Sequence, residues 1–275
     1  MVVNSENHSL ESSGILKQLA ANDRPTREAG INALETYLKS SQVISQLDFL
    51  KVWKGLYYCM WMTDRPKAHR DMAVKLSSLL LLVDDANTTQ FVETFWATIC
   101  REWNKIDMLR VDKFYLLIRH FVHMMFRRLL DSGWEMGLVE KWANILITYP
   151  LSCANVSVPD GIKYHMIDIY IDELERAVAV PEITETCNTN TNTTITPRED
   201  DHLENSASQR VCPIADIMRP FEVLARDGKS KIVKKRAITE VLNDTRLKSI
   251  WKYNAPQIKP PRDMGYKAAK RARIM

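Results

Sequence analysis

The side chains that could carry chemistry in this 275-residue chain are mainly cations. Residues 226–275 carry 15 Lys and Arg against 4 Asp and Glu, a balance of +11, whereas residues 1–225 carry −7 of the total of +4. A basic segment beside a mildly acidic body suits an anionic partner, and nucleic acid is the first candidate. The same composition is found in solvated and targeting segments, so the sequence leaves these interpretations open.

A second group of cations lies on a predicted helix over residues 107–130. Its apolar residues recur at spacings of three and four, which predicts one wide buried face. The opposite face is expected to carry Lys113, His120, His123 and Arg127. Such a row either binds phosphates or is a solvated exterior with local ion pairs, and the second is commoner for surface charge. The two histidines lack an evident third ligand, so no metal site is expected.

The sequence offers little for catalysis. Gly228-Lys229-Ser230 resembles the end of a phosphate-binding loop, but Val223 occupies the position of the required first glycine. There is no nucleophile motif of the type Gly-x-Ser-x-Gly, and no carboxylate cluster is evident. We therefore expect no enzyme, no cofactor and no small-molecule substrate. The five cysteines lie at least 25 positions apart without metal-ligand spacing, which predicts free thiols in a reducing compartment.

Aromatic residues are concentrated in a predicted helix over residues 46–62. Trp53, Tyr57 and Trp61 are four positions apart and share one helix face. Such rings can stack on bases, but large rings at helical spacing usually lie in a core, which is the interpretation we favour. Gly55 in the same helix predicts close packing against a neighbouring backbone or ring.

The elements that must position these residues are helices throughout, with no convincing strand pattern. The expected helices cover residues 10–21, 25–40, 46–62, 64–83, 88–104, 107–130, 134–148, 160–179, 213–226 and 230–251, the last with a break near Asn243. Asp23, Asp64 and Asp107 recur at intervals of 41 and 43, each as an expected cap for the second helix of a pair. This period predicts an all-α fold of HEAT-like or armadillo-like helical repeats, an α-α superhelix.

The remaining segments are expected to lie outside this fold. Residues 1–9 are predicted to be a disordered start, and residues 10–252 one helical-repeat domain. A Thr/Asn-rich insert at 181–210 lacks an apolar face and is predicted to be disordered, as is the basic tail over 253–275. No apolar run reaches the length that crosses a bilayer, and residues 1–14 lack a secretory pattern, so no membrane is expected.

Several aromatic-rich stretches are idiosyncratic enough to indicate a family. They are Trp53-Lys54-Gly55-Leu56-Tyr57-Tyr58-Cys59-Met60-Trp61-Met62-Thr63-Asp64-Arg65-Pro66, Phe95-Trp96 with Arg101-Glu102-Trp103, Leu109-Arg110-Val111-Asp112-Lys113-Phe114-Tyr115, Leu19-Ala20-Ala21-Asn22-Asp23, and Gly161-Ile162 with Tyr164-His165. Together they resemble the ribosomal RNA processing protein 1 family, strongly over residues 14–179 and weakly over 213–250. The short basic tail departs from the long extensions of many members, and the Thr/Asn insert is not a recognised family feature.

The resemblance implies a non-enzymatic factor of the nucleus and nucleolus that assembles the large ribosomal subunit. Its expected partners are the large-subunit pre-ribosomal particle, other assembly factors and pre-rRNA. The family supplies no catalytic residues. The candidate contacts with RNA or partners are Lys54, Arg65, Lys67, Arg70, Arg110, Lys113, Arg119, Arg127, Lys267, Lys270, Arg271 and Arg273.

Two other functions remain open at this stage. One is a protein-only helical-repeat adaptor with no direct RNA contact. The other is an enzyme such as a ribonuclease, which the absence of carboxylate clusters and metal-ligand spacing disfavours.

Overall fold

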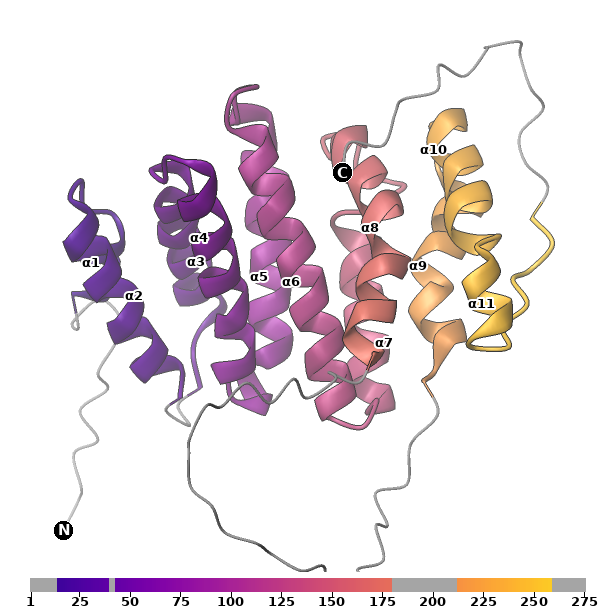
Figure 1. The fold of residues 1–275 in the computed structure, drawn as a ribbon, viewed down its shortest axis with the longest axis horizontal. Helices are drawn as coiled ribbons and strands as arrows, with labels where there is room; N and C mark the ends of the chain where they lie inside the picture. Colours follow the sequence, from indigo (N-terminus) through magenta and orange to yellow (C-terminus); the bar gives the residue numbers. More distant parts are fainter. Residues whose placement is uncertain (1–13, 40–42, 180–211, 259–275) are drawn as a thin grey trace, which may run out of the picture.

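A computed structural model describes residues 14–39, 43–179 and 212–258. Within these ranges the chain forms helices and no strand, and the helices stand side by side in a long row (Figure 1). The predicted all-α repeat fold is therefore confirmed. The expected segments at 1–9 and 181–210, and the tail beyond 258, lie outside the described residues.

The helix bounds follow the sequence pattern to within a few residues. They are α1 (Ile15–Leu19), α2 (Arg24–Leu38), α3 (Gln46–Trp61), α4 (Pro66–Ser78), η1 (Leu79–Leu82), α5 (Asp85–Glu102), η2 (Trp103–Lys105), α6 (Val111–Asp131), α7 (Met136–Thr148), α8 (Asp160–Val178), α9 (Ile214–Asp227), α10 (Lys231–Arg236), η3 (Ala237–Leu242) and α11 (Thr245–Ser249). The predicted break near Asn243 is confirmed, and η3 before it is a π-helical turn.

The helices form two layers, each stacked along the row. In the odd layer α1 packs on α3, α3 on α5, α5 on α7 and α7 on α9. In the even layer α4 packs on α6, α6 on α8, and α8 on α10 and η3, while α2 contacts η1. No helix can bury its apolar stripe alone, so stacking neighbours completes the core, as in helical-repeat proteins.

Aromatic rings join the two layers at the centre of the row. The Phe95 ring of α5 stacks on the Phe121 ring of α6, with centroids 3.7 Å apart. Trp53 of α3 meets Phe121 edge-on at 5.5 Å, and its indole Nε1–H donates to the Phe91 carbonyl at 3.0 Å. Trp53 and Tyr57 are buried and Trp61 is half-buried, so the prediction that these rings belong to the core is confirmed.

The predicted caps are only partly correct. Asp23 accepts a hydrogen bond from the Thr26 N–H at 2.9 Å and begins α2 as expected. Asp64 does not cap α4: Arg65 occupies the cap position with φ of 76° and supplies no side-chain bond. Asp107 accepts from the N–H groups of Leu109 and Arg110, so it closes the turn before α6 rather than the helix itself. All three aspartates nevertheless precede the second helix of a pair.

Candidate functional site

The turns between α3 and α4 and between η2 and α6 bring many of the predicted site residues to one end of the row. Both turns lie at the upper ends of the even-layer helices in Figure 1, and the turn before α6 projects beyond those beside it. We call this region the turn surface, comprising residues 54–70 and 101–113. Its polar side chains form a carboxylate-centred cluster, cation–ring contacts and a set of unpaired cations.

Glu102 is the centre of the charged cluster. This buried carboxylate is bridged by Lys54 at 2.8 Å, Lys105 at 3.0 Å and Arg101 at 3.0 Å. Burial alone would raise the pKa of Glu102, but the hydrogen bonds from the three cations outweigh it and lower the pKa to about 2. One negative charge is thus surrounded by three positive charges, which leaves the cluster with a net charge of +2.

Aromatic rings hold two of the predicted cations at the rim of the turn surface. The Lys54 ammonium lies 5.0 Å from the centre of the Tyr58 ring and 5.4 Å from that of Tyr57. The Arg110 guanidinium lies 4.8 Å from the centre of the Trp61 ring and also pairs with Asp107. Cations over ring faces are attracted to the electron-rich π system, so both side chains are oriented before any partner arrives.

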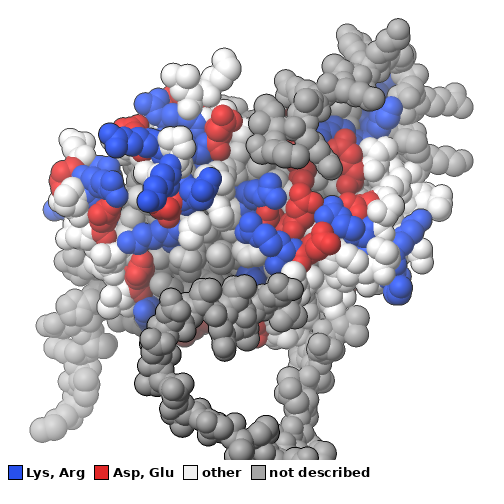
Figure 2. All heavy atoms as spheres, in the orientation of Figure 1, with Lys and Arg blue, Asp and Glu red and all other residues white. Residues whose placement is uncertain are grey.

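Three predicted cations, the cap residue Arg65 and the α4 residues Lys67 and Arg70, have no side-chain partner among the described residues. Arg65, Lys67 and Arg70 are exposed, and their side chains form no hydrogen bond or ion pair with the described residues. In Figure 2, many Lys and Arg side chains lie on the upper left of the molecule, with Asp and Glu side chains among them, as they are farther right. Arg65, Lys67 and Arg70 offer positive charge that no described acid pairs with.

Lys113 does not lie on a solvated face, contrary to the sequence-based expectation. Its side chain is 4% exposed, and its ammonium donates to the carbonyl oxygens of Trp61 and Thr63 at 2.7 Å each. Burial lowers the pKa of Lys113, with the nearby Arg110 adding to the effect. Lys113 caps the C-terminal end of α3, where carbonyls lack helical donors, so it cannot reach a ligand.

Arg119 and Arg127 also face a neighbouring helix more than solvent. Arg119 pairs with the buried Glu173 of α8 at 2.5 Å, and His123 lies 3.3 Å from the same carboxylate. Arg127 donates to the Ala177 carbonyl at 3.3 Å. Burial would raise the pKa of Glu173, but hydrogen bonds from His123 and Arg119 keep it below its usual value. Two of the four residues of the polar row, His123 and Arg127, thus contact α8, and Lys113 is buried, so the row is neither a free phosphate site nor a purely solvated exterior.

Ion pairs continue this junction toward the C-terminal helices. Arg236 pairs with Asp168 of α8 at 2.6 Å, and Arg246 pairs with Asp172 at 2.9 Å and Glu175 at 2.7 Å. The sequence reasoning missed these pairs. Their partners are separated by about 70 positions in the chain, and local spacing carries no signal for contacts at such a separation.

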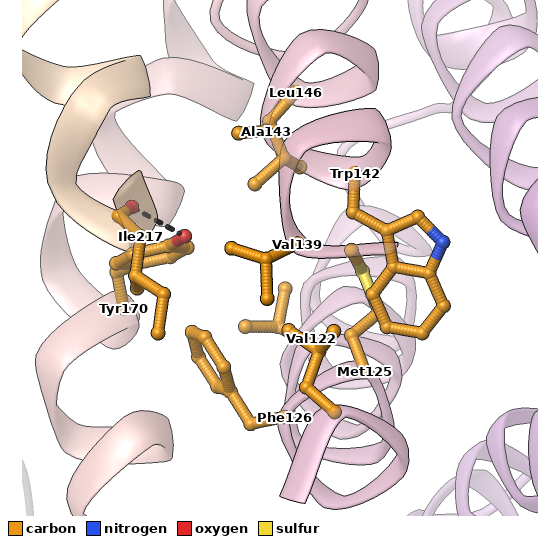
Figure 3. Close-up of a pocket in the computed structure, with 10 residues that line it drawn as sticks. Val122, Met125, Phe126, Val139, Trp142, Ala143, Leu146, Tyr170 and Ile217 are labelled. Carbon is orange, nitrogen blue, oxygen red and sulfur yellow. Dashed lines mark hydrogen bonds between the residues drawn. The ribbon is translucent and has the colours of Figure 1, made fainter. Parts of the chain in front are cut away.

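The described residues offer no evident reactive centre. No group of three His, Cys, Asp or Glu side chains in the described ranges could hold a metal ion, so His120 and His123 gain no third ligand there. Burial lowers the pKa of His120. A cavity of about 20 Å³ lies between α6, α7, α8 and α9 and is lined by apolar side chains around Tyr170 (Figure 3). The Tyr170 hydroxyl donates to the Ile217 carbonyl at 3.0 Å, so its proton is engaged within the protein.

Lys267, Lys270, Arg271 and Arg273 lie outside the described residues. The four described cysteines are free thiols. No described helix has the length and apolar character needed to span a bilayer.

A family model described as "Nucleolar protein, Nop52" matches residues 10–272 of this chain. The chain belongs to the Nop52 family. Among its relatives is human Ribosomal RNA processing protein 1 homolog B, which is 35% identical over 166 residues, covering 58% of this chain and 22% of the relative. Human homolog A is 34% identical over 176 residues, which cover 62% of this chain and 38% of the relative. The Drosophila melanogaster homolog is 32% identical over 169 residues, which cover 59% of this chain and 24% of the relative.

These matches confirm the family indicated by the sequence. The matched parts amount to between about a fifth and two fifths of the length of these Nop52 relatives. The turn surface contains most of the stretch at 53–66 that carries the resemblance, and parts of two others, Arg101-Glu102-Trp103 and 109–113.

Proposed function

We propose that this chain is a nucleolar factor for ribosome biogenesis that contributes to processing of pre-rRNA within precursors of the large subunit. It acts as a scaffold that binds other assembly factors and pre-rRNA. Membership of the Nop52 family and the names of its relatives support the process. The observation that carries direct RNA contact is the set of unpaired cations Arg65, Lys67 and Arg70.

These three unpaired cations suit the phosphate backbone of RNA. Lys and Arg side chains that neutralise phosphates release counterions, which makes binding strongly dependent on salt. Lys54 and Arg110 belong to the same turn surface and are held by aromatic rings. In this proposal Lys267, Lys270, Arg271 and Arg273 add further salt-sensitive affinity from the tail.

We also propose that the chain performs no catalysis. The carboxylates of Glu102 and Glu173 are held in their charged form by Lys, Arg and His neighbours, and their pKa values are low. A carboxylate with a depressed pKa is a weak general base near neutral pH. Purified protein that cleaves pre-rRNA, and loses this activity on substitution of a single acidic residue, would contradict this view.

The first experiment is purification of particles from cells through the tagged full-length chain. We expect large-subunit precursors and their RNA, together with nucleolar staining of the tagged protein. Recovery of neither the particle nor the RNA would refute the proposal. Deleting residues 254–275 tests the tail, and we expect weaker association with particles.

The second experiment tests direct contact with RNA. The triple variant Arg65→Ala/Lys67→Ala/Arg70→Ala should bind a labelled pre-rRNA fragment more weakly, with the slope of log affinity against log salt reduced by about one for each lost contact. Lys141→Ala is the matched control, because Lys141 is exposed on α7 without a partner among the described residues. Equal slopes for the triple variant and the control would exclude these phosphate contacts.

A second candidate function is a protein-only adaptor. The exposed apolar side chains of Met108 and Leu109 favour it, because they suit a protein neighbour better than a phosphate backbone. Crosslinking in cells distinguishes the two functions: association with particles without RNA adducts would identify the adaptor.

A further inference from the structure

An exposed apolar patch lies within the turn surface. It consists of Tyr58, Met62, Met108 and Leu109, which are 40%, 44%, 85% and 92% exposed; we call it the Met108 patch. Tyr58 and Met62 are four residues apart at the end of α3 and therefore share one helix face. Met108 and Leu109 occupy the projecting turn before α6. Large apolar side chains gathered at a projecting turn indicate a contact with another molecule.

Contacts between residues adjacent to the patch join its two halves; one contact is half-exposed and the other is buried. Arg110, next to Leu109, lies over the ring of Trp61, next to Met62. Lys113 fixes the same two segments from below through the Trp61 and Thr63 carbonyls. The patch is thus presented on supported backbone rather than on a free loop, which lowers the entropy lost when a partner binds.

The side of the Met108 patch next to Tyr58 is positively charged, whereas Asp107, directly before Met108, pairs with Arg110, and the exposed Asp64 follows Met62 by two residues. Lys54 lies 5.0 Å from the centre of the Tyr58 ring, and it belongs to the cluster in which three cations surround Glu102. Arg101 and Lys105 have half or more of their side chains exposed, at 50% and 67%. An apolar centre with cations along one side is complementary to a segment that carries apolar anchors beside acidic residues.

We propose that the Met108 patch binds a short acidic segment of another protein through one or more apolar anchor side chains. This deepens the proposed scaffold function by assigning it a surface and the chemistry of a partner. An RNA strand fits less well, because one face of the Tyr58 ring is already occupied by Lys54 and the aliphatic side chains at the projecting turn offer nothing for base recognition. The patch is made of other residues than the cations Arg65, Lys67 and Arg70 that we assign to phosphates.

A display library of random short peptides, selected on the immobilised full-length chain, tests the proposal. We expect enriched peptides in which Asp and Glu flank an apolar anchor. A synthetic copy of the best peptide should bind Met108→Ser/Leu109→Ser about tenfold more weakly. It should also bind Arg101→Ser/Lys105→Ser more weakly at low salt, with the difference shrinking as salt is added. Met136→Ser is the matched control, since Met136 is 52% exposed at the start of α7.

Methionine methyl groups provide a readout in the unmodified chain. With ¹³C-methyl methionine, the peptide should shift the signals of Met62 and Met108 and leave that of Met136 unchanged. Absence of enrichment, enriched peptides without acidic residues, equal binding to the Met108→Ser/Leu109→Ser variant, or shifts at Met136 alone would each overturn the proposal. The proposal would also be overturned if oligouridine shifted the signals of Met62 and Met108 and the peptide did not.

The two proposals fail separately. If tagged chain recovers no ribosomal particle but still selects acidic peptides through Met108, the ribosomal function is wrong and the docking patch stands. If particles are recovered normally and no peptide is selected, the patch is wrong and the ribosomal function stands.

Discussion

Replacing Lys113 by Met tests whether a buried cation closes the end of α3. The Met side chain has a similar length and keeps the apolar contacts of the Lys stem, but it donates no hydrogen bond. The Lys113 ammonium is the only side-chain donor to the Trp61 carbonyl among the described residues. The Thr63 carbonyl keeps one partner after the substitution, because the His69 ring lies 3.0 Å from it.

The expected loss follows from these contacts. A buried acceptor left without a partner costs about 1–3 kcal/mol, and the partly buried Trp61 carbonyl is expected at the lower end of this range. The Thr63 carbonyl keeps its contact with the His69 ring, so the loss of its hydrogen bond from Lys113 adds about 0.5–1 kcal/mol. Removing the ammonium also relieves the desolvation that lowers the pKa of Lys113, which offsets part of the cost. We expect Lys113→Met to lower the free energy of unfolding by about 1–2 kcal/mol.

Urea unfolding followed by circular dichroism and tryptophan fluorescence measures this change. Lys67→Met is the control, since Lys67 is exposed and unpaired, and it should alter stability by less than about 0.5 kcal/mol. If Lys113→Met is as stable as Lys67→Met, the carbonyl cap does not stabilise the turn surface and the reasoning fails.

Three further predictions concern packing and protonation. Gly55→Ala should destabilise by about 1 kcal/mol in urea unfolding despite the better helix propensity of Ala, because its Cβ would lie 2.9 Å from that of Leu19; a stabilised variant would contradict the packing. Burial lowers the pKa of His165 from 6.5 to about 4, so the folded form holds it neutral, and stability should fall as pH drops from 6.5 to 4. His165→Gln should flatten that part of the profile of urea midpoint against pH, and an unchanged slope would refute the assignment. Glu173→Gln removes the buried partner of Arg119, which is 42% exposed and keeps Asp172 at 3.8 Å, and should cost about 1 kcal/mol in thermal unfolding, whereas a loss near zero would mean that the pair is not stabilising.

Local patterns in the sequence were sufficient to predict the helices. The spacing of Trp53 and Tyr57 identified a buried face, and Asp23 followed by Pro25 marked a helix start that the structure retains. The interval between Asp23 and Asp64 located the beginning of successive second helices, although Asp64 does not cap one. Propensity, caps and periodicity act over a few residues, so they are readable without knowledge of the fold.

The candidate site was less predictable because its character depends on contacts between distant segments. Lys113 reads as part of a polar helix face, but the C-terminal end of α3 lies above that face and buries it. Arg119 similarly reads as a surface cation until Glu173 of α8 is placed beside it. Arg65 differs from Arg119 because no described acid pairs with it. Only the structure distinguishes an arginine that pairs across helices from one that is exposed and unpaired.

Each helix packs mainly on its nearest neighbours within a layer, and this limits how far the effect of a mutation extends along the row. The two ends of the row never meet, so α1 and α11 lend each other no support (Figure 1). In such a one-dimensional chain of interfaces, losing a terminal pair shortens the array, whereas breaking the Phe95–Phe121 contact would loosen the two layers at a pair that has neighbours on both sides. The severity of a mutation should therefore depend on its position along the row as much as on the side chain it removes.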